Sequence, residues 1–119
     1  MRIFLVENHA DTLACLRRHL LRAGHEVATA QTSADALRDL RVKSCDLLLA
    51  DIGLPDSDGW TLLESLGTAR PKRAIAMSGR DSPADRQRSR EAGFQHHLPK
   101  PFLPGELDAV LRDLPENRA

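Results

Sequence analysis

An unbroken run of apolar residues, Leu47 to Ala50, ends directly at a carboxylate, Asp51. The run shows no alternation of apolar and polar residues, which is typical of a strand covered on both faces in a parallel sheet. Gly53 then turns the chain, and Asp58 is placed to cap a helix that begins near Gly59. In open parallel sheets, functional side chains gather beyond the carboxyl ends of the strands. Asp51 is therefore placed like a reacting side chain, although Asp is also a common turn and capping residue.

Strand and helix signals alternate along the whole chain. Besides residues 47–50, short strands are predicted at residues 3–6, 26–30, 73–77 and 94–98. Four of the five helices between and after the strands have apolar residues at helical spacing, and the helix at residues 83–92 is nearly all polar. The helices are expected to begin at Asp11 or Thr12, Thr32 or Ser33, Asp58, Ser82 and Pro104. Gly24 and Gly93 stand where a helix ends. The alternation predicts an α/β fold with a five-stranded parallel sheet, five helices and right-handed crossovers.

Length and charge limit the classes of function. The 119 residues suit a single domain, residues 1–119, without a linker. Seventeen basic residues balance seventeen acidic ones, which argues against a nucleic-acid partner because such surfaces carry a basic excess. The sequence has neither a membrane-spanning apolar run nor a signal-peptide pattern, so a cytoplasmic location without membrane contact is expected. Cys15 and Cys45 are too few for a disulfide framework, and both are expected to be small buried residues.

Polar side chains follow four of the five predicted strands. These side chains are Glu7, Asn8, Asp51, Ser78 and Lys100. Carboxylate oxygens suit Mg²⁺, and a carboxylate can also attack phosphorus to form an aspartyl phosphate. Such a transfer needs neutralisation of the phosphoryl oxygens, which a metal ion, an ammonium group and a hydroxyl donor together supply.

Two classes with related chemistry fit less well. Phosphatases and dehalogenases with an Asp nucleophile usually carry a second Asp two residues later, where this chain has Gly53. A flavin- or nucleotide-binding module needs a glycine-rich loop after the first strand, and residues 9–11 read His-Ala-Asp.

Four segments together carry a resemblance to a known family. They are Val-Glu-Asn at residues 6–8, Asp-Ile-Gly-Leu-Pro-Asp-Ser-Asp-Gly at 51–59, Met-Ser-Gly at 77–79 and Lys-Pro-Phe at 100–102. In this order and spacing they resemble the receiver domains of two-component response regulators. The resemblance implies a doubly wound, flavodoxin-like fold. It also implies that Asp51 accepts a phosphoryl group from a histidine kinase or phosphotransfer protein, in a signalling domain rather than an enzyme.

The resemblance also assigns roles to residues around Asp51. Glu7 and Asn8 correspond to the acidic pair that binds Mg²⁺ together with Asp51, and the Gly53 carbonyl corresponds to a further metal contact. In the same way, Ser78 resembles the hydroxyl residue that bonds the phosphoryl group, and Lys100 resembles the lysine that pairs with it.

Two positions depart from the family pattern. Asn8 stands where the second acidic residue is usual, so Mg²⁺ affinity is expected to be lower than with two carboxylates. His97 stands where Phe or Tyr usually swings inward on phosphorylation; His97 is either a polar substitute for this switch, acting with Ser78, or a partly exposed residue with no role. These departures keep a second interpretation open: a degenerate receiver that binds partners without phosphorylation.

The output of such a domain is less closely specified by the sequence. The polar helix at residues 83–92 and the strand after it are interpreted either as a solvated face or as a surface for self-association or an effector. The segments from Asp51 to Asp56 and from Ser89 to Phe94, with the His-Leu pair before Lys100, are similar to receivers at the carboxyl ends of hybrid histidine kinases. The chain is thus either a stand-alone receiver or a piece of a larger protein.

Overall fold

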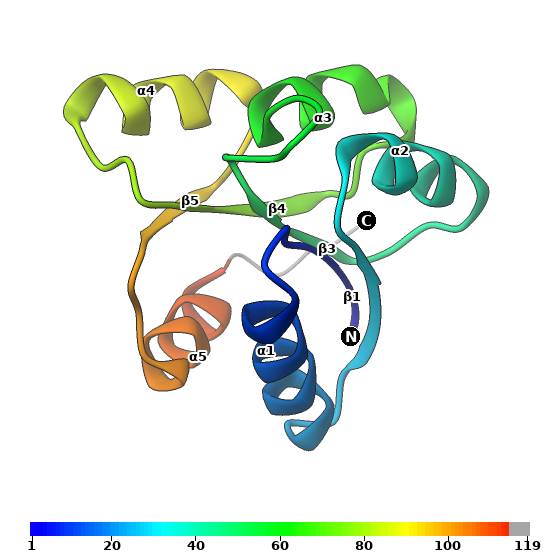
Figure 1. Cartoon of the computed structure of the whole chain (residues 1–119), viewed down its shortest axis with the longest axis vertical. Helices are drawn as coiled ribbons and strands as arrows, with labels where there is room; N and C mark the ends of the chain where they lie inside the picture. The colour runs from blue at the N-terminus through cyan, green and yellow to red at the C-terminus, as the bar shows by residue number, and fades with distance from the viewer. Residues whose placement is uncertain (115–119) are drawn as a thin grey trace.

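A computed structural model describes residues 1–114 of the chain. Its elements, in order, are β1 Arg2–Val6, α1 Ala10–Arg22, β2 Glu26–Ala30, α2 Ser33–Val42, β3 Leu47–Asp51, α3 Gly59–Leu66, the short 3₁₀ helix Gly67–Ala69, β4 Arg73–Ser78, α4 Pro83–Ala92, β5 His96–Pro99 and α5 Pro104–Asp113. The strands form one parallel sheet in the order β2-β1-β3-β4-β5. The predicted five-stranded, doubly wound α/β fold is confirmed (Figure 1).

The helices cover both faces of the sheet. Figure 1 shows α1 and α5 on one side and α2, α3 and α4 on the other. Each face has its own apolar core: Leu16 and Leu107 pack with the side chains of Ile3 and Leu5 on the first face, and Leu62 packs on the second. Because β3 lies in the middle of the sheet between these layers, every residue of its apolar run is buried, as the sequence predicts.

Three helices begin at the predicted caps. The side chain of Thr32 accepts a hydrogen bond from the Asp35 N–H, and that of Asp58 accepts from the Thr61 N–H. Ser82 and Asp85 form a reciprocal capping box at the start of α4. These contacts satisfy backbone donors that the helix itself leaves free, and they fix where each strand-to-helix loop ends.

Two element boundaries differ from the prediction. Helix α1 begins at Ala10, before Asp11 and Thr12, and the residue that precedes it, His9, makes no side-chain capping hydrogen bond. Strand β5 begins at His96 because Phe94 turns into the core, where it is 3% exposed. The side chain of Gln95 then accepts from the Ala74 N–H at 2.6 Å, beside the start of β4.

The two cysteines differ from each other. Cys15 is exposed on α1, so the prediction that it is buried was wrong. Cys45 is half-buried before β3; its thiol donates to the Leu47 carbonyl at 3.4 Å, and burial raises its pKa to about 11. Apolar surroundings disfavour the thiolate, which explains the direction of the shift.

Within residues 1–114, every helix is too short or too polar to cross a lipid bilayer.

Candidate functional site

The carboxyl ends of the strands bring the predicted site residues to one edge of the sheet. Asp51 is the last residue of β3, and Ser78 is the last residue of the neighbouring β4. Glu7 follows β1 directly, and Lys100 follows β5. Parallel strands all end on the same side, so residues far apart in the sequence meet there.

Lys100 bridges the two buried carboxylates of this edge. Its Nζ donates to Glu7 Oε1 at 2.7 Å and to Asp51 Oδ2 at 3.0 Å. Glu7 is fully buried, and Asp51 is only 6% exposed. Two carboxylates and one ammonium group thus share a site from which most water is excluded, where a charge interaction is stronger than at the surface.

Backbone N–H groups hold the remaining carboxylate oxygens. The Gly53 N–H donates to Asp51 Oδ1 at 3.0 Å, and the Asn8 N–H donates to Glu7 Oε2 at 3.0 Å. Asn8 itself is exposed, and this contact to the site comes from its backbone. The two carboxylates are therefore oriented from both sides before any ligand binds.

Burial and charge act in opposite directions on this cluster. Burial raises the pKa of Glu7, and the neighbouring Asp51 carboxyl raises it further, while Lys100 lowers it without cancelling the rise. For Lys100, burial alone lowers the pKa, but the hydrogen bonds to Glu7 and Asp51 outweigh burial, and the pKa is raised. The Lys100 ammonium group therefore stays protonated, and its single positive charge does not neutralise both carboxylates.

Ser78 is buried beside this site and connects to the loop after β4. Its Oγ accepts a hydrogen bond from the Arg80 N–H at 2.9 Å, and its carbonyl accepts from the Lys100 N–H at 2.7 Å. In the sheet register, Ser78 follows Met77, the residue paired with Asp51. Ser78 is thus one residue beyond Met77, the strand partner of Asp51, and its carbonyl holds the backbone of Lys100.

His97 is buried, and both of its ring nitrogens are hydrogen-bonded. Nε2 lies 2.6 Å from the Arg80 carbonyl, and Nδ1 lies 2.8 Å from Ser89 Oγ. Ser89 Oγ also accepts from Trp60 Nε1 at 2.9 Å. The interpretation of His97 as a partly exposed residue was wrong: the residue is 8% exposed and already lies inside.

The direction of each hydrogen bond in this chain follows from the groups involved. The indole N–H of Trp60 only donates, and the Arg80 carbonyl only accepts. A neutral His97 therefore donates from Nε2 and accepts at Nδ1 from the Ser89 hydroxyl. We call Trp60, Ser89, His97 and the backbone N–H and carbonyl of Arg80 the α3–α4 relay. It leads from α3 across α4 and β5 to the hydroxyl of Ser78.

Sequence reasoning did not find the partners in the α3–α4 relay. Ser89 is three residues before the buried Ala92, so helical spacing could have placed it on the inner face of α4. Trp60 is the only tryptophan of the sequence, and an indole N–H needs a hydrogen-bond partner when it is buried. Nothing in the spacing of the two residues shows that they share a hydrogen-bond chain with His97.

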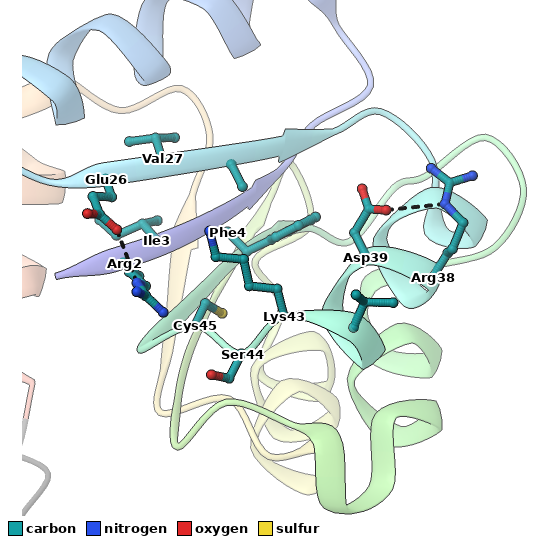
Figure 2. A pocket seen from close by; sticks show the side chains of 12 residues that line it. Arg2, Ile3, Phe4, Glu26, Val27, Arg38, Asp39, Lys43, Ser44 and Cys45 are labelled. Carbon is teal, nitrogen blue, oxygen red and sulfur yellow. Dashed lines mark hydrogen bonds and ion pairs between the residues drawn. The ribbon is translucent and has the colours of Figure 1, made fainter.

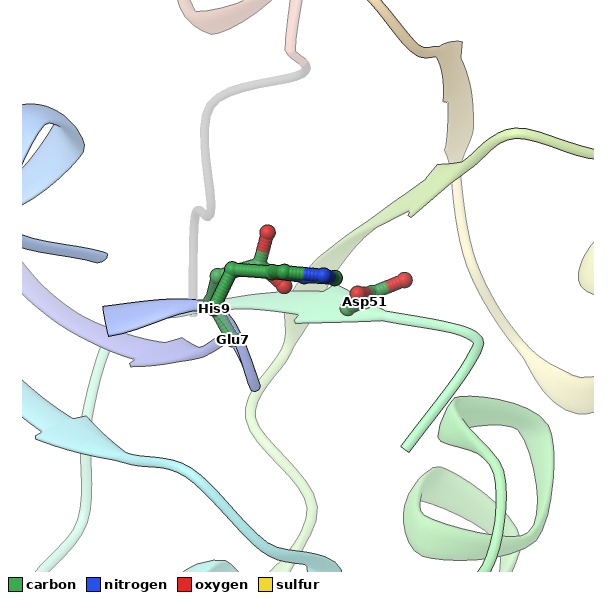
Figure 3. A group of neighbouring side chains, drawn as sticks. All are labelled: Glu7, His9 and Asp51. Atoms are coloured by element: carbon green, nitrogen blue, oxygen red, sulfur yellow. The ribbon is translucent and has the colours of Figure 1, made fainter. Parts of the chain in front are cut away.

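His9 is an exposed residue at the entry to α1, and its ring borders the acidic cluster. One ring nitrogen and carboxylate oxygens of Glu7 and Asp51 all lie within 4.8 Å of one another. Figure 3 shows the imidazole extending toward Asp51. A hollow of about 670 Å³ opens beside these groups, lined by Glu7, His9, Lys100 and neighbouring residues of α1 and the β5–α5 loop.

A second hollow lies at the opposite end of the sheet. It has a volume of about 540 Å³ between the amino-terminal halves of β1 and β2 and the end of α2, and its lining includes Phe4, Ala28 and Cys45 (Figure 2). Two ion pairs at its rim, Arg2 with Glu26 and Arg38 with Asp39, are exposed. Because the carboxylates and Lys100 are at the other edge, this hollow is separate from the candidate site.

Comparison with known proteins adds an independent finding. Residues 3–112 match the family model of the response regulator receiver domain. The transcriptional activator protein IrlR of Burkholderia pseudomallei is 33% identical over 114 residues, which cover 96% of this chain and 50% of IrlR. The chain spans about half the length of the curated relatives it matches.

Solved structures agree with this match. A CheY-like response regulator receiver domain protein from Methanospirillum hungatei is 30% identical, with a TM-score of 0.87 over 94% of this chain and 90% of that one. The non-phosphorylated HemR receiver domain from Leptospira biflexa is 26% identical, with a TM-score of 0.89 over 99% and 98% of the two chains. The fold is therefore flavodoxin-like, as expected from the sequence.

Proposed function

The chain belongs to the response regulator receiver family, and from this premise we propose that it is a phosphoacceptor domain, residues 1–119, of a two-component phosphorelay. The observation that carries the proposal is the position of Lys100, whose ammonium group contacts both Glu7 and Asp51 at the sheet edge. Receiver domains are signalling domains that work with histidine kinases or phosphotransfer proteins. Asp51 accepts the phosphoryl group from such a donor.

The residues around Asp51 suit this transfer. A carboxylate oxygen of Asp51 attacks phosphorus, the P–N bond of the donor phosphohistidine breaks, and the electron pair returns to the imidazole. Lys100 then balances charge on the phosphoryl oxygens, and the Ser78 hydroxyl donates a hydrogen bond to one of them. The Gly53 N–H keeps the Asp51 side chain in position during the attack.

The donor set fits Mg²⁺, which receiver domains generally bind at an acidic pocket. Glu7 and Asp51 supply buried carboxylate oxygens, and the Gly53 carbonyl and the Asn8 side chain are the further assigned ligands. When bound, Mg²⁺ neutralises phosphoryl charge that Lys100 alone cannot balance. Because Asn8 is neutral, this pocket has fewer fixed negative charges than one with two acids after β1.

The output surface is the face of α4 and β5, joined to the site through the α3–α4 relay. Movement of Ser78 toward a phosphoryl group removes the acceptor of the Arg80 N–H, and the Arg80 carbonyl in turn holds His97. A change at Asp51 therefore reaches Ser89 and α4. An effector or a second copy of the chain reads this face.

The alternative, a degenerate receiver, is motivated by the two departures from the family pattern, Asn8 and His97. Titration with Mg²⁺ and then beryllofluoride, a phosphoryl mimic, separates the two by amide chemical shifts. A working receiver gives saturable shifts at Asp51, Ser78 and Lys100 that extend to Ser89. A degenerate receiver shows none of these shifts, and its partner binds the native chain and the Asp51→Asn variant equally well.

A further inference from the structure

The loop from β1 to α1 presents an unused imidazole to the acidic site. His9 precedes the first residue of α1, with backbone angles of φ −82° and ψ 116°, yet its side chain caps no N–H of that helix. Its backbone carbonyl accepts the Leu13 N–H at 2.9 Å, so the helix start is held without the ring. The ring is exposed, and one of its nitrogens lies within 4.8 Å of a carboxylate oxygen of Glu7 and one of Asp51 (Figure 3).

The donor set at this site therefore contains nitrogen as well as oxygen. Glu7, His9 and Asp51 each offer one ligand atom, and all three atoms lie within 4.8 Å of one another. Two ligands of one ion lie no farther apart than twice the metal–ligand distance of about 2.0–2.2 Å, which is slightly less than 4.8 Å. Small side-chain movements therefore suffice for all three atoms to bind the same ion. Carboxylate oxygens suit Mg²⁺ and Mn²⁺, whereas imidazole suits first-row transition metals.

The charge balance makes the type of donor important. Two carboxylates and the ammonium group of Lys100 leave one formal negative charge, and Asn8 adds none. This single net negative charge contributes little to the affinity of the site for a dication. That affinity depends on the neutral donors, and an imidazole strengthens binding of Ni²⁺ most, that of Mn²⁺ less, and that of Mg²⁺ least, because Mg²⁺ dehydrates reluctantly and prefers oxygen.

We propose that His9 is a nitrogen ligand of this site, so that the site favours first-row transition dications, Ni²⁺ above all, over Mg²⁺. The inference rests on the proposed metal site at Glu7 and Asp51 and goes beyond it. It assigns a metal class and a ligand specific to this chain. Two features support it: the ring is free of a capping role, and it faces the two carboxylates.

The test uses the whole chain and Mg²⁺, Mn²⁺ and Ni²⁺ alone as probes. Calorimetric titration of the native chain and of His9→Ala is expected to show at least about a tenfold loss of Ni²⁺ affinity in the variant and a smaller loss of Mn²⁺ affinity. Mg²⁺ affinity is expected to change by less than about twofold. His9→Gln serves as a second variant, because an amide keeps a polar side chain at the helix start.

A spectroscopic measurement identifies the ligand directly. Pulsed electron paramagnetic resonance of the Mn²⁺-loaded chain is expected to show coupling to an imidazole nitrogen, which His9→Ala abolishes. His96→Ala is the matched control, because His96 begins β5, at the end of that strand away from Lys100. Nitrogen coupling that persists in His9→Ala, or Mg²⁺ and Ni²⁺ affinities that fall by the same factor, would overturn the inference.

Phosphorylation of the same variants separates this inference from the proposed function. If Asp51 takes up a phosphoryl group with Mg²⁺ while Mn²⁺ shows no coupling to His9, only the metal inference fails. If Mn²⁺ couples to His9 while Asp51 takes up none, the metal inference stands and the phosphoacceptor function fails.

Discussion

At the scale of single residues, the buried carboxylate of Glu7 is expected to lower the stability of the folded chain near neutral pH. It is fully buried beside Asp51, and the ammonium group of Lys100 must balance both carboxylates. Burial raises the pKa of Glu7, so the folded chain holds its proton more tightly than the unfolded chain does. The contribution of Glu7 to stability is therefore present below about pH 4.5, its ordinary pKa, and is lost as pH rises through the folded pKa.

Glu7→Gln is expected to change stability in a pH-dependent way. In the presence of a metal chelator and near neutral pH, the variant is expected to be more stable than the native chain by about 1–2 kcal/mol. The reason is that one buried negative charge is removed while Lys100 still pairs with Asp51. The difference is expected to shrink as pH falls toward 4.5. Urea unfolding at several pH values measures it.

A surface variant provides the control for Glu7→Gln. Glu26→Gln removes an exposed carboxylate that pairs with Arg2, and its effect is expected to stay within about 0.5 kcal/mol at every pH. A Glu7→Gln chain that is less stable than the native chain near neutral pH would show that the Lys100 contact outweighs the buried charge.

At the scale of elements, the α3–α4 relay joins two helices and a strand through one hydroxyl. Ser89 Oγ lies between Trp60 Nε1 and His97 Nδ1, and Ser89 is only 1% exposed. The seam between the helices is also held at the surface, where Arg88 pairs with Glu64 and lies over the Trp60 ring at 5.3 Å. Ser89 is the buried centre of this seam.

Ser89→Ala is expected to destabilise the chain by about 1–3 kcal/mol, because it leaves the Trp60 indole N–H and His97 Nδ1 without their partner. Circular dichroism during urea unfolding measures the loss. The indole N–H resonance of Trp60 is expected to shift on addition of beryllofluoride in the native chain and to shift less in the variant. Ser65→Ala, at an exposed position of α3, is the control; equal stability of the two variants would contradict a structural role for the relay.

The elements themselves could be predicted well from the sequence, for identifiable reasons. The apolar run of β3 and the caps Thr32, Asp58 and Ser82 are local signals, and the structure agrees with each. The start of β5 was misplaced because Phe94 has strand propensity, yet its ring fills the core between α4 and the sheet. Tertiary packing decides that boundary, and a single sequence does not display packing.

At the scale of the whole molecule, topology assembles the candidate site. The chain passes through the sheet five times in one direction, so Glu7, Asp51, Ser78 and Lys100 reach one edge despite their separation in sequence. This convergence could be predicted because parallel strands share a carboxyl edge. His9 follows Glu7 and Asn8 directly and so borders the same edge, but the direction of its ring depends on how the β1–α1 loop turns, which the local sequence does not define.

Phosphorylation of Asp51 is the central claim, and intact-mass spectrometry tests it most directly. After incubation with a small phosphodonor in Mg²⁺, the native chain is expected to gain the mass of one phosphoryl group, and Asp51→Asn is expected to gain none. Asp46→Asn, which changes the residue just before the same strand, is expected to behave as the native chain does. Undiminished incorporation in Asp51→Asn, or none in the native chain, would contradict the account.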